Sequence, residues 1–230
     1  MDEVSAELQH ESALGLCRLL SLADSALPVG GLAHSWGLEE SVHQGRVNEA
    51  NLDSYLSAWC EESLRLELQF VAAAHKLHAN GTFASYQWEH LSDVVSAFKT
   101  NREGRQSSLR LGGRLLQLLR HQPSCDLDLP RFGHYAMVFG LAGSQLGLAE
   151  LSTLVAYGNQ SLTGLVSAAQ RLLPVGQIAA TKLNWSLKDL LVKIAMRACD
   201  SAIDEAQSFA PLLDIASMSH PYTPVRLFLT

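Results

Sequence analysis

The chain has 230 residues, of which 47% are apolar and 17% charged, a balance typical of a globular protein rather than a disordered one. Seventeen Lys and Arg stand against 23 Asp and Glu, so the net charge at pH 7 is −6. That sign argues against a nucleic-acid partner, because proteins that bind a phosphate backbone gain from net positive charge.

Residues 1–11 are expected to form a flexible N-terminal tail. They carry four acidic residues and lack the apolar stretch that a secretory signal needs. Residues 12–230 contain no Pro- or Gly-rich linker, internal repeat or charge block that would divide them. We therefore predict a single domain over 12–230, in a cytoplasmic protein.

Apolar residues recur with a period close to 3.6 along almost the whole chain, which is typical of amphipathic helices. The pattern predicts a long helix over most of 50–79 and another over 187–203, with Ser186 as the N-cap of the second. Breaker residues such as those at 158–159 separate the remaining helices. These are predicted near 12–22, 37–44, 83–99, 104–121, 131–147, 149–157, 161–171, 174–183 and 211–219. Because no strand-like alternation is found, the predicted fold is an all-α bundle of about ten helices.

The predicted central helix carries a row of small residues. They recur at steps of three and four residues, at Gly133, Ala136, Gly140, Gly143 and Gly147. Such a row leaves a groove that another helix can approach closely. It indicates either a helix crossing within the chain or the seam of a homodimer. The apolar run 135–149 has 15 residues, whereas a membrane span needs about 20, so no membrane insertion is expected.

Ser35 lies in the sequence Ala-His-Ser-Trp-Gly, the nearest match in the chain to the nucleophile turn of a serine hydrolase. That turn needs a strand before the serine, and the breaker-rich residues 27–31 do not predict one. A simpler interpretation makes Ser35 the N-cap of the helix that begins near Gly37. A hydrolase that uses Ser35 as its nucleophile remains an alternative.

No metal-binding set is predicted. His75 and His78 lie at i and i+3 on the long helix, but no third ligand follows at suitable spacing. The four cysteines are at least 43 positions apart, so no Cys-x-x-Cys pair exists. We expect no catalytic residue and no tightly bound metal or cofactor.

Five arginines between residues 102 and 120 make one region locally basic. They form either a solvated helix surface or a docking face for an acidic protein partner. The last residues, 225–230, follow two prolines and are expected to be extended. This C-terminal tail packs either on its own core or with a partner.

Several segments together resemble the UreF family of urease accessory proteins. The first is the stretch Leu22 to Glu39, which contains the residues Pro-Val-Gly-Gly-Leu at 28–32 and His-Ser-Trp-Gly at 34–37. The others follow in the order and spacing of the family, at 108–116, 138–142, 167–177 and 211–220. The resemblance covers nearly the whole chain.

The resemblance implies an all-α homodimer without turnover of its own. Such proteins bind a second accessory protein, called UreH or UreD, and recruit the GTPase UreG, which carries nickel to apo-urease. Nickel is then handled transiently by the complex. We expect the partner-binding surface to include Pro28, Gly30, Gly31, Leu32, His34, Ser35, Glu39, Arg171, Gln177 and Arg226. A generic helical adaptor unrelated to urease is a further alternative.

Overall fold

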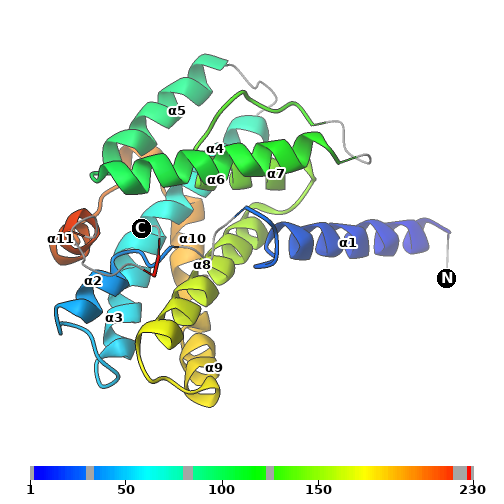
Figure 1. Ribbon diagram of the computed structural model, residues 1–230. Coiled ribbons are helices and arrows are strands. Elements are labelled where there is room, and N and C mark those ends of the chain that lie inside the picture. Colours follow the sequence, from blue (N-terminus) through cyan, green and yellow to red (C-terminus); the bar gives the residue numbers. More distant parts are fainter. Residues whose placement is uncertain (1–2, 30–33, 80–84, 123–126, 220–226, 229–230) are drawn as a thin grey trace.

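The computed structural model describes residues 3–29, 34–79, 85–122, 127–219 and 227–228 (Figure 1). Within these ranges the regular secondary structure is helical and no strand occurs, so the all-α prediction is confirmed. None of the helices in the described ranges is long and apolar enough to cross a membrane. The helices are α1 (Glu3–Leu22), α2 (Leu38–His43), α3 (Leu52–Trp59), η2 (Cys60–Leu64), α4 (Arg65–Ala79), α5 (Ser85–Phe98), α6 (Arg102–Arg120), α7 (Tyr135–Gln145), α8 (Glu150–Leu172), α9 (Gln177–Ser186), α10 (Lys188–Asp200), η3 (Ile203–Glu205) and α11 (Pro211–Ser219).

The predicted helix over 50–79 is continuous through α3, η2 and α4, where η2 is a single π-helical segment. The N-terminal helix is longer than predicted, because α1 begins at Glu3 and includes most of the expected tail. The flexibility of residues 1–11 stays a prediction.

Two local predictions are wrong. The sequence around Gly158 was expected to separate two helices, but α8 runs unbroken from Glu150 to Leu172. Gly158 instead provides space, because a Cβ there would overlap the side chain of Leu191 on α10. The predicted N-cap of α10, Ser186, is the last residue of α9, and its hydroxyl donates to the carbonyl oxygen of Leu183 at 3.0 Å.

The core is built around α7, whose residues from Tyr135 to Gly143 are all buried. It packs against α4, α6 and α8. A Cβ at Gly140 would overlap the carbonyl oxygen of Val71 on α4, so the two helices approach at backbone distance. A Cβ at Gly143 would likewise overlap Thr153 on α8.

The other members of the small-residue row have related roles. Ala136 is fully buried, and a Cβ at Gly133 would touch the ring of Trp88. Gly147 adopts φ 72° in the turn after α7, a left-handed conformation that favours glycine. Gly140 and Gly143 thus make helix crossings within the chain, whereas Gly133 and Gly147 lie outside α7.

Gly112 and Gly113 are neighbours in α6 that test this packing. A Cβ at Gly112 would overlap the carbonyl oxygen of Gly133, whereas nothing lies within 4 Å of one at Gly113. Gly112→Ala should lower the free energy of unfolding by about 1–3 kcal/mol, because α6 must move away from residue 133. Gly113→Ala should raise it by up to about 1 kcal/mol, because alanine favours helix. Urea denaturation followed by circular dichroism measures both changes, and equal effects would contradict the close approach.

Candidate partner-binding surface

Leu227 and Phe228 dock beside the first turn of α2. The carboxylate of Glu39 accepts hydrogen bonds from the backbone N–H groups of Leu227 at 2.6 Å and Phe228 at 3.3 Å. Phe228 is buried, and the guanidinium carbon of Arg171 lies 5.6 Å from the centroid of its ring. Glu39 is only 4% exposed, which strengthens these charge-assisted bonds. Three segments far apart in sequence therefore meet at Glu39, Arg171 and Phe228.

A left-handed turn positions Glu39. Trp36 has φ 53° and Gly37 has φ 80°, and the helix α2 begins directly after them. Gly37 also packs on α11, since a Cβ there would lie 3.3 Å from the carbonyl oxygen of Leu213. A positive φ at a tryptophan costs about 1–3 kcal/mol and is maintained only where the surrounding packing requires it.

The predicted capping role of Ser35 is wrong. The N-cap position falls on Gly37, which has no side chain to cap the helix. Ser35 lies two positions before the N-cap, and its carbonyl oxygen accepts a hydrogen bond from the N–H of Leu38 at 3.0 Å. Ser35 is fully buried, and the described part of the chain has no strand before it. This geometry therefore does not support the hydrolase alternative.

The predicted surface residues divide into three groups. Pro28, Arg171 and Gln177 are exposed. His34, Ser35 and Glu39 are buried. The rest, Gly30, Gly31, Leu32 and Arg226, lie outside the described residues.

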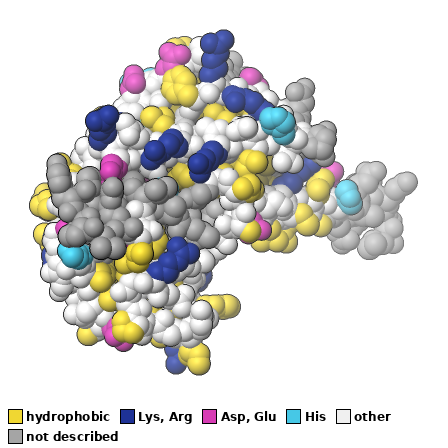
Figure 2. Space-filling view, viewed as in Figure 1, with side chains coloured by type: hydrophobic (Ala, Val, Ile, Leu, Met, Phe, Trp, Pro, Cys, Tyr) yellow, Lys and Arg dark blue, Asp and Glu magenta, His cyan; other side chains and the backbone are white. Residues whose placement is uncertain are grey.

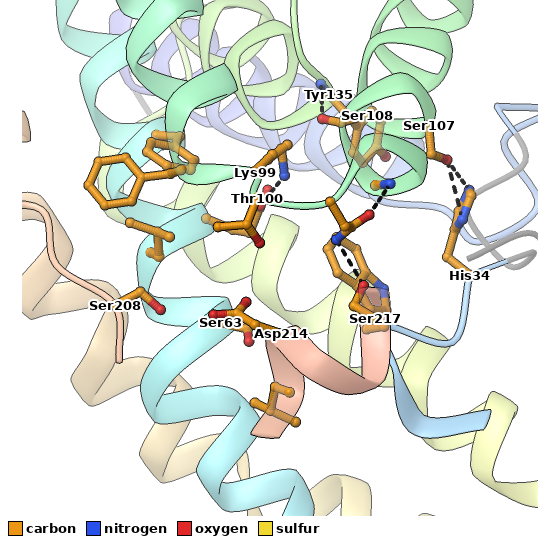
Figure 3. Close-up of a pocket in the computed structure, with 18 of the residues that line it drawn as sticks. His34, Ser63, Lys99, Thr100, Ser107, Ser108, Tyr135, Ser208, Asp214 and Ser217 are labelled. Carbon is orange, nitrogen blue, oxygen red and sulfur yellow. Dashed lines mark hydrogen bonds and ion pairs between the residues drawn. The ribbon is translucent and has the colours of Figure 1, made fainter. Parts of the chain in front are cut away.

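A cavity of about 230 Å³ lies beneath this surface, between α4, α6 and α11 (Figure 3). Its wall contains many hydroxyl groups, among them those of Ser63, Thr100 and Ser217. The side chain of Trp59 also lines it, and the indole N–H of Trp59 finds no hydrogen-bond partner among the described residues. Within the wall, the side-chain amide of Asn101 donates a hydrogen bond to the hydroxyl of Ser217 at 2.9 Å. Such a wall can hydrogen-bond water or a small polar molecule.

A buried ion pair closes one side of the cavity. Lys99 Nζ lies 2.5 Å from the carboxylate of Glu67, and the hydroxyl of Tyr157 donates to the same carboxylate at 2.9 Å. Burial raises the pKa of Tyr157 well above its usual value, so the phenol stays protonated as a donor. The ammonium of Lys99 also lies 6.0 Å from the ring centroid of Trp36. The pair joins α4 and α8 to the segment between α5 and α6.

Sequence reasoning missed Glu67 and Lys99. They are 32 positions apart and take part in no motif, so only the folded chain brings them together. One signal was present in the sequence. Glu67 lies between Leu66 and Leu68, in the part of the predicted helix that is rich in apolar residues. A charge at such a position needs a partner.

Two histidines are buried and neutral. Burial, followed by the nearby charges of Arg110 and Arg114, lowers the pKa of His34 to about 4. Burial, followed by the charge of Lys99, lowers the pKa of His134 to about 4 as well. Ser107 Oγ lies 3.1 Å from Nε2 of His34, and Ser96 Oγ lies 2.8 Å from Nε2 of His134. Both rings therefore act as uncharged hydrogen-bonding groups.

The histidine pair on α4 has structural contacts. His75 Nε2 lies 3.0 Å from the carbonyl oxygen of Leu148, and His78 Nδ1 lies 3.2 Å from Ser144 Oγ. Both rings thus hold the turn between α7 and α8. Within the described ranges, no group of three or more His, Cys, Asp or Glu is arranged to hold a metal ion.

The basic helix α6 lies on one face of the molecule. Figure 2 shows Lys and Arg side chains gathered over the part of this face where α6 lies. Arg114 of α6 donates a hydrogen bond to the carbonyl oxygen of Val29 at 3.2 Å. This contact anchors the start of the loop that leads to His34.

Comparisons with known proteins agree on one family. The sequence model described as UreF matches residues 47–188. The chain is 32% identical to the urease accessory protein F of Oryza sativa subsp. indica, over 91% of this chain and 83% of the relative. It is 30% identical to the urease accessory protein UreF of Paenarthrobacter aurescens, over 92% of this chain and 96% of the relative. The UreF of Chromohalobacter salexigens is 31% identical over 96% of both chains.

The tail contact can be tested at Glu39. In Glu39→Gln the amide has one acceptor oxygen in place of two charged ones, so the two tail N–H groups lose part of their bonding. A charge-assisted hydrogen bond contributes about 1.5–3 kcal/mol. Hydrogen exchange of the Leu227 and Phe228 amides should therefore become about 10- to 100-fold faster. Glu49→Gln, at an exposed position, is the control, and unchanged exchange in Glu39→Gln would contradict the contact.

The free energy of unfolding should decrease as the pH falls, because of the buried histidines. An unfolded histidine binds a proton near pH 6.5, whereas His134 in the folded state does so only near pH 4. Acid therefore favours the unfolded state, and stability is lost as the pH falls from 6.5 towards 4. His134→Gln should reduce the loss of unfolding free energy between pH 7 and pH 5 by about 1–2 kcal/mol.

Urea denaturation at the two pH values measures this difference. His10→Gln is the matched control, because His10 is exposed and should leave the pH dependence unchanged. A pH dependence of His134→Gln equal to that of the original chain would show that His134 does not contribute.

Proposed function

The chain belongs to the UreF family of urease accessory proteins, and we propose that in urease maturation it binds a UreH- or UreD-type accessory protein and recruits the GTPase UreG. The complex would regulate the GTPase and deliver nickel to apo-urease. Nickel is the cargo of this complex and not a resident cofactor of the chain. In this proposal the chain forms a cytoplasmic homodimer and catalyses no reaction itself.

The docked tail is the observation that supports this proposal most directly. Phe228 is held by Glu39 through its backbone and by Arg171 through its ring. The surface around it is therefore assembled from α2, α8 and the residues 227–228, which are distant in sequence. A partner that binds here would recognise the folded chain with its tail in place, which suits an assembly factor.

Regulation by ordering of the GTPase switch segments fits this surface better than an arginine finger. A finger needs an extended guanidinium that reaches a phosphate in the partner's site. The guanidinium of Arg171 already lies against the ring of Phe228, where it positions the tail. We therefore propose that the surface presents a rigid docking site and acts on the conformation of the GTPase.

Co-expression with the GTPase and the UreH- or UreD-type protein, followed by affinity capture and light scattering, tests the proposal. Arg171→Ala should reduce capture of the GTPase about tenfold, because loss of a cation–π contact with partial exposure costs about 1–2 kcal/mol. Urease activation in a strain that lacks its own accessory protein should fall in parallel. Lys193→Ala, which removes a surface cation from α10, should leave both readouts unchanged.

The outcomes distinguish the proposed docking surface from the proposed role in urease maturation. If Arg171→Ala binds and activates normally, the docking surface lies elsewhere. If the original chain retains neither partner and does not restore urease activation, the proposed role itself fails. Arg226→Ala in the same assay tests the predicted contribution of Arg226.

A further inference from the structure

The outward face of α6 carries a straight row of polar residues. They follow one another at steps of four, four, three, four and three positions, which keeps them on one side of the helix. All of them are exposed. This outer row consists of Arg102, Gln106, Arg110, Gly113, Gln117 and Arg120. It extends over about 27 Å, since each residue advances a helix by about 1.5 Å, and Figure 2 shows Lys and Arg side chains gathered over this part of the molecule.

The arginines of α6 have no carboxylate partner within the described part of the chain. The helix has five arginines and one glutamate, which is half-buried, whereas the whole chain has a net charge of −6. None of the ion pairs among the described residues includes an arginine of α6. Other helices do pair their surface cations, as Lys193 with Asp189 and Arg197 with Glu61. The positive charge of the outer row is therefore available to another molecule.

Guanidinium and amide groups give the outer row its binding chemistry. Arg102 and Arg110 form no hydrogen bond or ion pair with any described residue. Arg120 uses only part of its guanidinium, on a backbone carbonyl oxygen. The planar fork of a guanidinium matches a carboxylate in bidentate geometry. Gln106 and Gln117 add amides that both donate and accept, so the row fits a ligand that carries several carboxylates.

An acidic protein segment fits the outer row better than a nucleic acid or a membrane. A net charge of −6 repels a long phosphate backbone, and the row has no aromatic side chain on which a base could stack. It also has no apolar side chain that could enter the surface of a bilayer. Carboxylates along one side of a protein segment would meet the arginines in turn.

Gly113 supplies an independent observation in the middle of the outer row. A Cβ there would meet nothing in the described part of the chain within 4 Å, in contrast to one at Gly112. Glycine inside an exposed helix costs about 1 kcal/mol relative to alanine, and no described contact offsets that cost. The missing side chain leaves a low point between Arg110 and Gln117, where the backbone of another chain can approach α6 closely.

We propose that the outer row of α6 is a docking face for an acidic segment of a partner protein. Carboxylates of that segment pair with Arg102, Arg110 and Arg120, and its backbone passes over Gly113. The contact is polar along its whole length, so it is reversible and weakens as salt is added. It is distinct from the surface around Phe228, so the chain has a second place at which it can hold a protein.

Fluorescence anisotropy with an acidic peptide tests this face on the purified full chain. The probe is an alanine-based helical peptide as long as α6, with glutamate at alternating steps of four and three residues. The same peptide with glutamine in place of glutamate is the uncharged control. The glutamate peptide should bind at low salt and weaken about tenfold at physiological ionic strength, because salt screens exposed charges. The glutamine peptide should not bind.

Charge reversal shows whether the outer row carries the binding. Arg102→Glu with Arg110→Glu should raise the dissociation constant of the glutamate peptide about thirtyfold, since two attractive pairs become repulsive. Lys182→Glu with Lys193→Glu is the matched control. It changes the net charge by the same amount at exposed positions on α9 and α10, and should bind the peptide as the original chain does.

Gly113→Ala separates binding from stability. It keeps every charge of the outer row and should still weaken peptide binding about threefold or more, because the added methyl group holds the partner backbone away. The same variant is expected to have a higher free energy of unfolding, as predicted above. A purely structural glycine would not lower affinity while raising stability.

Failure of this face can be distinguished from failure of the proposed role. A glutamate peptide that does not bind, or that both double variants weaken equally, overturns the docking face and leaves the role in urease maturation standing. Tighter binding of duplex DNA or phosphatidylserine vesicles, lost in Arg102→Glu with Arg110→Glu, overturns the protein partner. Unchanged binding in Gly113→Ala overturns the close approach. Arg171→Ala should bind the peptide normally, and a loss there would move the acidic segment to the surface around Phe228.

Discussion

The close crossing of α4 and α7 is the contact on which the rest of the structure depends. Gly140 lies so near the carbonyl oxygen of Val71 that the helix backbones meet without an intervening side chain. Because α7 is buried from Tyr135 to Gly143, it has no face left for solvent, and α6 and α8 must cover it. Protein interiors are close-packed, so these small separations determine where every outer helix lies.

The candidate surface follows from that arrangement. The segments that hold Glu39 and Arg171 belong to α2 and α8, and the bundle brings both to the place where the tail ends. In the core, the ion pair of Lys99 and Glu67 satisfies two charges that would otherwise be costly to bury. The surface is thus rigid at its base, while its outer part is formed by a tail held through a few strong contacts.

The errors of sequence reasoning have a common cause. Gly158, expected to end a helix, lies inside α8 because α10 needs the space of its missing side chain. Ser35 and Ser186 have side chains suited to N-caps, but the turns before α2 and α10 place other residues at the cap position. The pairing of Glu67 with Lys99 was not predicted, because the two residues are 32 positions apart and only the folded chain brings them together. In each case tertiary packing decided what a local pattern left open.

The sequence by itself determined the helical class, the approximate extent of most helices and the family, because periodicity and ordered motifs are local or linear properties. The resemblance also placed Glu39 and Arg171 on one predicted partner-binding surface, and the structure brings both into contact with residues 227–228. Only the tertiary structure decided that Gly140 and Gly143 make crossings within the chain, that residues 227–228 rest on Glu39, and that Glu67 pairs with Lys99. These features depend on contacts between residues up to 189 positions apart, and no local pattern specifies such distances.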